Sequence, residues 1–170
     1  PLATLKELPS RNRRAFLELA GPVWSTARRS QRPLAAMMVD IDFFKAINDT
    51  HGHAMGDRVL EAVSHLLAEV CRSGDITARW GGEEFAILLP ESSAAQAAQL
   101  AERLRVKIAN LRLGSPRKPI RLSASFGIAE RSGEHESLDH LIHDADEWLY
   151  RAKESGRNRV AGPLVVQPAG

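Results

Sequence analysis

Residues 76–89 read ITARWGGEEFAILL, and this stretch decides much of the fold. Apolar and polar side chains alternate from Ile76 to Trp80, the pattern stops at Gly81-Gly82-Glu83, and an apolar run resumes from Phe85 to Leu89. Alternation with a period of two is typical of strands, and two such runs joined by a glycine-containing turn predict a β-hairpin. The tip of the predicted hairpin carries two adjacent carboxylates, Glu83 and Glu84.

A second predicted strand also ends in acidic side chains. Leu34 to Val39 is a continuous apolar run, typical of a strand buried on both faces, and Asp40-Ile41-Asp42 follows it at once. Carboxylates that converge without cationic neighbours repel one another, and a bound Mg²⁺ or Mn²⁺ relieves that repulsion. The simpler alternative makes the glutamates solvated turn residues and Asp42 the N-cap of a short helix over Phe43–Asp49. For Asp42 taken alone, we favour the cap.

The rest of the chain alternates between helical and strand patterns. Apolar periodicity predicts helices over 11–30, 54–71, 92–111 and 138–155; Gly21-Pro22 should bend or divide the first. Leu19 and Val23 are expected on the buried face of that first helix, and Trp148 on the buried face of the last. Gly114-Ser115-Pro116 predicts a loop, 120–128 a strand with one core face, and Val160 a short final strand. The predicted fold class is α/β, with a mixed central sheet of about five strands surrounded by helices.

Composition narrows the class of protein. The 170 residues are 44% apolar and 26% charged, which is ordinary for one soluble globular domain. Because 23 Lys and Arg against 21 Asp and Glu give a net charge of only +2, a nucleic-acid polymer is not the expected partner. The single Cys71 cannot form an internal disulfide, and no apolar run approaches the ~18 residues of a membrane span. We therefore expect a cytoplasmic domain, one that is an excerpt of a longer protein.

The hairpin tip Gly81-Gly82-Glu83-Glu84-Phe85 resembles the signature of the GGDEF family of diguanylate cyclases, in its GGEEF form. The similarity extends to residues 40–49, DIDFFKAIND, and to the His51-Gly52-His53 and Gly56-Asp57 that follow. It also includes Ser125-Phe126-Gly127 and residues 145–158, ADEWLYRAKESGRN. The resemblance covers roughly residues 5–160, with the motifs in the family's order and spacing.

This resemblance implies a palm-like nucleotidyl cyclase fold and the condensation of two GTP molecules into cyclic di-GMP, with release of two pyrophosphates. It implies Mg²⁺ or Mn²⁺, two ions per active site, held by Asp40, the carbonyl of Ile41, Glu83 and Glu84. Glu83 would also assist deprotonation of the ribose 3′-hydroxyl that attacks the α-phosphate. Gly81 and Gly82 would keep the turn open to the nucleotide. Each domain would hold one GTP, so the reaction would need a homodimer.

The resemblance also implies nucleotide contacts. Asn48 and Asp57 match guanine-reading positions, where an amide and a carboxylate can pair with the base edge. Without the resemblance, we would interpret Asn48 as a helix C-cap and Asp57 as a solvated acid. The other substrate-binding positions lie at helix starts and near the end of the chain, and they are Phe43, Phe44, Lys45, His53, Lys153 and Arg157. A zinc site at His51 and His53 is not expected, because no further ligand has suitable spacing.

Arg72-Ser73-Gly74-Asp75 resembles the family's inhibitory RxxD motif. The five residues Ile76 to Trp80 separate it from the glycines, about 17 Å when extended at ~3.3 Å each, so it cannot belong to the catalytic pocket. An Arg fork and an Asp suit the phosphates and guanines of the product, and their coupling to catalysis would be feedback inhibition. Arg103 matches a secondary position of this site. The alternative is an exposed ion pair at a helix end, and for Arg103 a solvated helix residue.

The chain departs from the family near its start, where Ala3, Lys6 and Glu7 replace the usual Asp, Thr and Gly. We expect residues 1–30 to be a linker and helix, 31–162 the catalytic core and 163–170 a tail, with a regulatory or membrane domain preceding the excerpt. Two other functions stay open. The first is a weak or inactive domain that acts as a cyclic di-GMP receptor through Arg72 and Asp75. The second is another nucleotidyl cyclase or polymerase-like palm with the same two-metal chemistry.

Overall fold

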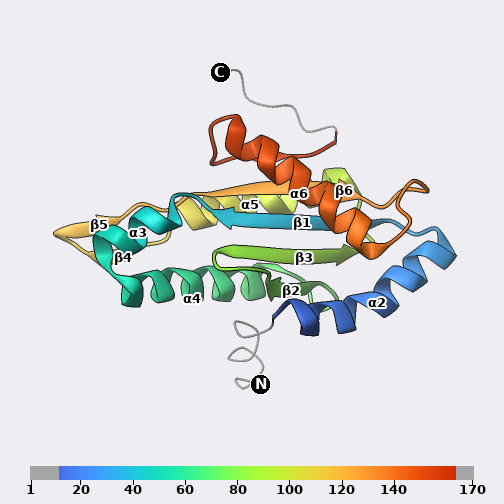
Figure 1. Cartoon of the computed structure of the whole chain (residues 1–170), viewed down its shortest axis with the longest axis horizontal. Helices are drawn as coiled ribbons and strands as arrows, with labels where there is room; N and C mark the ends of the chain where they lie inside the picture. Colours follow the sequence, from blue (N-terminus) through green and yellow to red (C-terminus); the bar gives the residue numbers. More distant parts are fainter. Residues whose placement is uncertain (1–11, 164–170) are drawn as a thin grey trace.

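The computed structural model describes residues 12–163. Its central sheet has five strands in the order β2-β3-β1-β6-β7 (Figure 1). Their bounds are Leu34–Ile41 for β1, Ile76–Arg79 for β2, Glu84–Pro90 for β3, Ala124–Glu130 for β6 and Val160–Ala161 for β7. All neighbouring pairs are antiparallel except β6 and β7, which run parallel. The predicted hairpin, the short final strand and the mixed sheet are therefore confirmed.

Helices cover both faces of this sheet, because β1 is apolar on both sides. Ala35, Met37 and Val39 pack with α4 (His53–Val70) and α5 (Ala94–Ala109) on one face. Leu34, Ala36 and Met38 pack with α2 (Arg13–Ser30) and α6 (Leu138–Glu154) on the other. The short α3 (Phe44–His51) follows β1 directly. Since side chains alternate along a strand, Asp40 falls on the α6 face.

A close backbone contact with β6 and an N-cap residue hold α6 in place on the sheet. A Cβ atom on Gly127 of β6 would lie 2.1 Å from the carbonyl oxygen of Ala145 and from the amide nitrogen of Leu149, so only glycine allows this approach. At the start of α6, Ser137 caps the helix by accepting a hydrogen bond from the backbone amide of His140.

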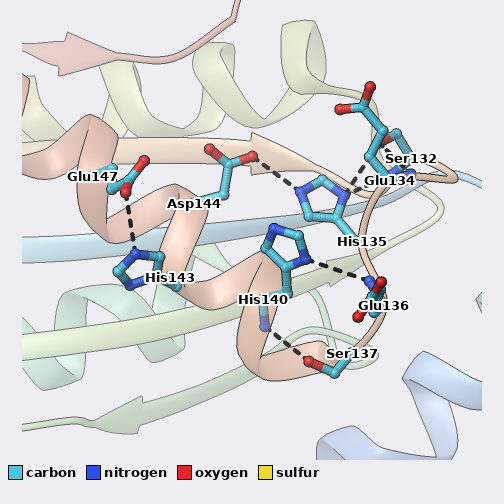
Figure 2. Close-up of polar contacts among 9 residues, drawn as sticks. All are labelled: Ser132, Glu134, His135, Glu136, Ser137, His140, His143, Asp144 and Glu147. Carbon is cyan, nitrogen blue, oxygen red and sulfur yellow. Dashed lines mark hydrogen bonds and ion pairs between the residues drawn. The ribbon is translucent and has the colours of Figure 1, made fainter.

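Two histidines tie the preceding loop to α6 (Figure 2). The ring of His135 accepts a hydrogen bond from the backbone amide of Ser132, 2.9 Å, and its Nε2 lies 3.0 Å from the carboxylate of Asp144 on α6. His140 accepts from the backbone amide of Glu136 at 3.4 Å. This end of α6 is therefore held by hydrogen bonds, and the helix brings its last turn to a fixed place on the sheet.

Several expectations for the first and last helices are wrong. Of the two outcomes expected at Gly21-Pro22, a bend or a division of the first helix, the division is wrong, since α2 continues through Pro22. Leu19 is 46% exposed, and Trp24 contributes to the buried face of α2 together with Phe16. Trp148 is half-buried rather than internal, and the Arg151 guanidinium lies over its ring, 4.5 Å from the ring centre.

The expected loop and long strand after α5 are also corrected. Residues around Gly114 form a small hairpin, β4 (Leu113–Ser115) and β5 (Lys118–Ile120), which lies beside α3 (Figure 1). Gly114 has φ +83°, and a Cβ there would lie 2.5 Å from the carbonyl oxygen of Lys118, so glycine permits the close pairing. The strand predicted over 120–128 is divided between β5 and β6, and β6 is buried on both faces.

Within residues 12–163, no helix has the length and apolar character needed to cross a membrane. The departures at Ala3, Lys6 and Glu7 and the tail after Pro163 lie outside the described residues.

Candidate active site

Two carboxylates face each other across neighbouring strands. Asp40, near the end of β1, is the register partner of Glu84, the first residue of β3. Directly opposed residues place their side chains on the same face, with Cβ atoms about 4.5–5.5 Å apart. Asp40 is 5% exposed, and Glu84 is half-buried. The strand ends that the sequence singled out therefore meet at one edge of the sheet.

The hairpin tip that carries Glu83 and Glu84 is closed by backbone and side-chain contacts. The amide of Trp80 donates to the carbonyl of Glu84 at 2.8 Å, and Arg79 Nε donates to the carbonyls of Gly81 and Gly82 at 3.3 and 3.1 Å. A Cβ on Gly82 would meet nothing within 4 Å, and one on Gly81 would meet only the side chain of Glu84. Packing therefore does not demand glycine here, and the backbone at the tip is left open.

Ile41 connects the two acidic strand ends. Its amide donates to the carbonyl of Glu83 at 3.3 Å, so the end of β1 and the hairpin tip are held together. The three carboxylates are therefore neighbours. The charge of Glu83 raises the pKa of Asp40, and the charges of Asp40 and Glu83 raise the pKa of Glu84.

Burial and like charges raise the pKa of both opposed carboxyl groups. For Asp40, desolvation is the main cause, opposed by the hydrogen bond and charge of Lys153 and reinforced by Glu83 and Asp42. For Glu84, desolvation is again the main cause, followed by repulsion from Asp146 on α6 and from Asp40. The sequence reasoning missed Asp146, although it lies inside the quoted 145–158 motif. The site therefore holds more negative charge than its own cations neutralise.

Lys153 is the cation that reaches this edge. It lies in the last turn of α6, and its Nζ donates to Oδ2 of Asp40. Lys153, which the resemblance matched to a substrate-binding position, therefore lies on a carboxylate of the acidic strand ends in this structure.

Asp42 does not cap the helix, and the cap expectation is wrong. Its carboxylate accepts hydrogen bonds from Ser125 Oγ and Ser123 Oγ, both at 2.6 Å, and from the backbone amide of Asn158 at 3.0 Å. The N-cap of α3 is Phe43, in the left-handed region at φ 55°, with no side-chain cap bond. Asp42 instead connects the end of β1 to Ser123 just before β6, to Ser125 within β6 and to the loop after α6.

The positions matched to guanine recognition lie on α3 and α4. Asn48 is half-buried, and its Oδ1 is buried without a hydrogen-bond partner. A Cβ on Gly56 would lie 1.8 Å from that oxygen, so Gly56 provides the space for the amide. Asp57 is the next residue of α4 and is exposed, as is His53 at the start of that helix.

The phosphate-binding candidates surround the start of α3. The Phe43 ring is 65% exposed, and the Arg157 guanidinium lies over it at 4.8 Å from the ring centre. Phe44 packs against the core beside α4, and Lys45 is exposed. A shallow hollow of about 230 Å³ borders this turn and includes Asp42 and Phe43 in its lining.

The donor set suits a divalent cation, although its side chains do not surround one point. Within residues 12–163, no three or more His, Cys, Asp or Glu side chains lie close enough together to hold a metal ion. His51 and His53 are not part of such a group. Lys153 engages Asp40 instead. The carboxylates are nevertheless hard oxygen donors. Burial, and to a smaller extent mutual repulsion, raises the pKa of Asp40 and Glu84, and Mg²⁺ or Mn²⁺ would relieve that repulsion. The residues therefore fit such an ion once Lys153 moves.

Arg72, Asp75 and Arg103 line a separate hollow of about 200 Å³, which also includes Ser92, just before α5, and Gln96 in the first turn of α5. Arg72 Nη2 donates to the carbonyl of Pro90 at 3.1 Å and to Ser92 Oγ at 3.0 Å. These contacts are at the end of β3 opposite Glu84, so the expected separation from the carboxylate edge is confirmed.

Asp75 is the buried group of this second hollow. Its side chain is 2% exposed; Oδ2 accepts from the Arg72 amide at 2.8 Å, while buried Oδ1 has no hydrogen bond and lies 3.7 Å from Arg72 Nη2. Desolvation raises the pKa of Asp75, and the Arg72 amide and charge oppose this. The hollow therefore combines an exposed guanidinium with an incompletely satisfied carboxylate.

Comparisons with known proteins agree with this arrangement. The profile of the family described as "Diguanylate cyclase, GGDEF domain" matches residues 7–159. The chain is 41% identical over 150 residues to the diguanylate cyclase DgcM of Escherichia coli K12, which is 88% of this chain and 35% of DgcM. It is also 41% identical over 136 residues to the response regulator PleD of Caulobacter vibrioides, 76% of this chain and 29% of PleD. The chain thus spans about a third of the length of these relatives.

A solved structure has the same fold. The GGDEF domain of DgcB from Caulobacter crescentus, in complex with c-di-GMP, superposes with a TM-score of 0.85 at 34% sequence identity. The superposition covers 91% of this chain and 89% of that one.

Proposed function

The chain belongs to the GGDEF family of diguanylate cyclases, and from this premise we propose that its domain condenses two GTP molecules into cyclic di-GMP and releases two pyrophosphates. The observation that carries the proposal is the opposed pair Asp40 and Glu84 at the sheet edge, with Lys153 beside them. In each half-reaction a ribose 3′-oxygen bonds to the α-phosphorus of the other GTP. The bond from that phosphorus to pyrophosphate breaks, and the hydroxyl proton leaves.

Two Mg²⁺ or Mn²⁺ ions would be held by Asp40, the Ile41 carbonyl, Glu83 and Glu84. Such ions, when bound, lower the pKa of the attacking hydroxyl and neutralise the triphosphate. Glu83, at the open tip of the hairpin, would accept the hydroxyl proton or help bind the ions. The open backbone at Gly81 and Gly82 would admit the nucleotide.

The remaining contacts would recognise GTP. The unpartnered, buried Oδ1 of Asn48 supports a role in reading guanine, since a buried polar atom without a partner is costly unless a ligand satisfies it. Asp57 would accept from the N1 and N2 hydrogens of the base. The start of α3 would contact the phosphates through Phe43, Phe44 and Lys45, and Lys153 and Arg157 would hold the terminal phosphate. His53, at the start of α4, would be a further substrate-binding residue.

Catalysis would need two domains related by a two-fold axis, because each presents one set of carboxylates to one GTP. Residues 1–30 would link the 31–162 core to a regulatory or membrane domain, and the chain's share of DgcM and PleD is consistent with such additional parts. The GTP, the cyclic product and a second copy are then the partners, and no nucleic-acid polymer is required.

The hollow at Arg72, Asp75 and Arg103 would bind cyclic di-GMP as a feedback inhibitor. The c-di-GMP complex of the similar DgcB domain supports this ligand class, and the underused Asp75 Oδ1 supports a guanine contact. Product bound at this end of β3 would lower activity at the opposite end through linkage between the two sites.

Turnover by the purified chain tests the catalytic proposal. GTP with Mg²⁺ should yield pyrophosphate and cyclic di-GMP, and the rate should rise more than linearly with protein concentration if two domains must meet. Glu84→Ala should abolish product, whereas Glu91→Ala, an exposed acid at the other end of β3, should not. No product from a forcibly dimerised chain would refute the proposal.

The hairpin glycines offer a second test that separates folding from chemistry. Gly82→Ala adds a Cβ where nothing lies within 4 Å, so the melting temperature should stay nearly unchanged. Turnover should nevertheless fall about tenfold or more, if the nucleotide approaches that backbone closely. Unchanged turnover would contradict the role assigned to the open tip.

Calorimetry with cyclic di-GMP distinguishes feedback inhibition from a receptor role without catalysis. Arg72→Ala should weaken binding about tenfold or more by removing a charge-assisted phosphate contact, while the exposed Arg32→Ala should not. In the enzyme, Arg72→Ala should also relieve inhibition by the product. Tight product binding without any GTP turnover would instead favour the receptor.

A further inference from the structure

The pairing of Lys153 with Asp40 affects how metal ions and nucleotide bind to the proposed site. Lys153 Nζ donates to Oδ2 of Asp40, and within residues 12–163 no second cation forms an ion pair with this carboxylate. Asp40 is 5% exposed, and the Lys153 side chain is 26% exposed. One ammonium therefore covers a buried carboxylate that is also a proposed metal ligand.

The pair is flexible only on the lysine side. Asp40 is inside β1, hydrogen-bonded between β3 and β6, and α6 is held against β6 at Gly127. The lysine head, however, sits on a four-carbon stem at the helix end, so rotation of that stem can move the charge by several ångströms without moving the helix.

An ammonium ion and a divalent cation cannot use the same carboxylate oxygen together. A metal ion that binds Asp40 must displace Lys153, and the displaced cation then needs a negative partner. The terminal phosphate of a bound nucleotide is such a partner, because lysine binds phosphate as a point charge. Arg157 serves as a contrast, since its guanidinium lies over the Phe43 ring, 4.8 Å from its centre, rather than on Asp40.

We propose that Lys153 is a two-position cation: it covers Asp40 in the empty site and moves to the nucleotide phosphate in the loaded one. This inference rests on the proposed GTP site. Metal ions alone then bind weakly, because they compete with a tethered cation. Nucleotide removes the competitor, so metal and nucleotide strengthen each other's binding reciprocally. One of the acidic side chains at this edge, Asp40, is thereby kept paired until substrate arrives.

The first test measures Mn²⁺ alone, without nucleotide, by the electron paramagnetic resonance signal of the free ion at pH 8. Lys153→Met keeps the length of the stem and removes the charge, so it should bind Mn²⁺ several-fold more tightly than the wild-type chain. Arg157→Met removes a nearby cation that is not on Asp40 and should match the wild type. Lys153→Gln repeats the measurement if the methionine variant is poorly folded by circular dichroism.

An affinity for Mn²⁺ that is unchanged or weaker in both Lys153 variants overturns the proposal. Equal strengthening in the Lys153 and Arg157 variants also overturns it, since that would be a general charge effect. These measurements need no turnover. A chain that makes no cyclic product would refute the proposed function while leaving the Mn²⁺ competition measurable.

The second test is a double-mutant cycle on nucleotide binding in EDTA. The ligand is 3′-deoxy-GTP, which lacks the attacking hydroxyl and is not consumed. Asp40→Asn should tighten binding by releasing Lys153 to the phosphate, and this gain should largely vanish when Lys153→Met is also present. A gain of the same size in both backgrounds would show that Lys153 does not carry the effect and would overturn the proposal.

Discussion

Substitutions at Asp42 distinguish two roles for its side chain, a helix N-cap and a buried hydrogen-bond acceptor. In a cap role, Asp42→Ser should be nearly neutral, because serine caps as well as aspartate, and Asp42→Ala should cost about 1 kcal/mol. The structure predicts a different result. The carboxylate accepts from Ser123, Ser125 and the amide of Asn158, and serine is too short to serve these donors together.

The loss of unfolding free energy depends on how exposed to water the three donors are once Asp42 no longer accepts from them. Ser125 is 0% exposed, so its hydroxyl would lose a charged partner without replacement by water, at about 2 kcal/mol. Ser123 is half-buried and Asn158 is exposed, so water can substitute and each loss is about 0.5–1 kcal/mol. Both Asp42→Ala and Asp42→Ser should therefore lower the free energy of unfolding by about 3–4 kcal/mol, a large part of the ~5–15 kcal/mol of a typical domain.

Urea unfolding followed by circular dichroism gives this free energy, provided that the m-value is unchanged. Asp49→Ala, an exposed acid on α3, is the matched control and should stay within about 0.5 kcal/mol of the wild type. If Asp42→Ser unfolds with wild-type stability while Asp42→Ala loses about 1 kcal/mol, the cap is the true role and the hydrogen-bonding account fails.

Three further predictions concern packing, pH and thiol reactivity. Gly127→Ala drives a Cβ into the α6 backbone, so the melting temperature should fall by about 6 °C or more, whereas Gly133→Ala, with nothing within 4 Å, should change it little; equal shifts would contradict the close helix contact. Because the folded state raises the pKa of Glu84, it binds that proton more tightly than the unfolded chain, so metal-free stability should fall as pH rises from the ordinary carboxyl range through the raised pKa. Glu84→Gln should flatten this slope in urea titrations at successive pH values, and an unchanged slope would argue against the shift. Burial raises the pKa of Cys71 to about 12, so at pH 8 the folded chain should react with a thiol reagent at least a hundredfold more slowly than the urea-unfolded chain, by order of magnitude; similar rates would show that the thiol is not protected.

Much of the fold could be predicted because it depends on local pattern. The apolar run before Asp40, the alternation before Gly81-Gly82 and the apolar run after them each predict a strand, and all three strands are present. The small hairpin around Gly114 was missed because a glycine next to Ser115 and Pro116 is equally typical of a loop. The exposure of Leu19 was missed because periodicity gives a face of a helix but not the width of the surface that covers it.

The sequence by itself determined the α/β class, the acidic strand ends and the family motifs, because each depends only on residue types and their spacing along the chain. Only the tertiary structure decided which charges meet. Asp42 changed from cap to buried acceptor because Ser123, Ser125 and Asn158 arrive from distant segments. Lys153 lies on Asp40, 113 positions away, because Gly127 lets α6 approach the sheet. Such pairings depend on how strands and helices pack across the chain, and no local spacing encodes them.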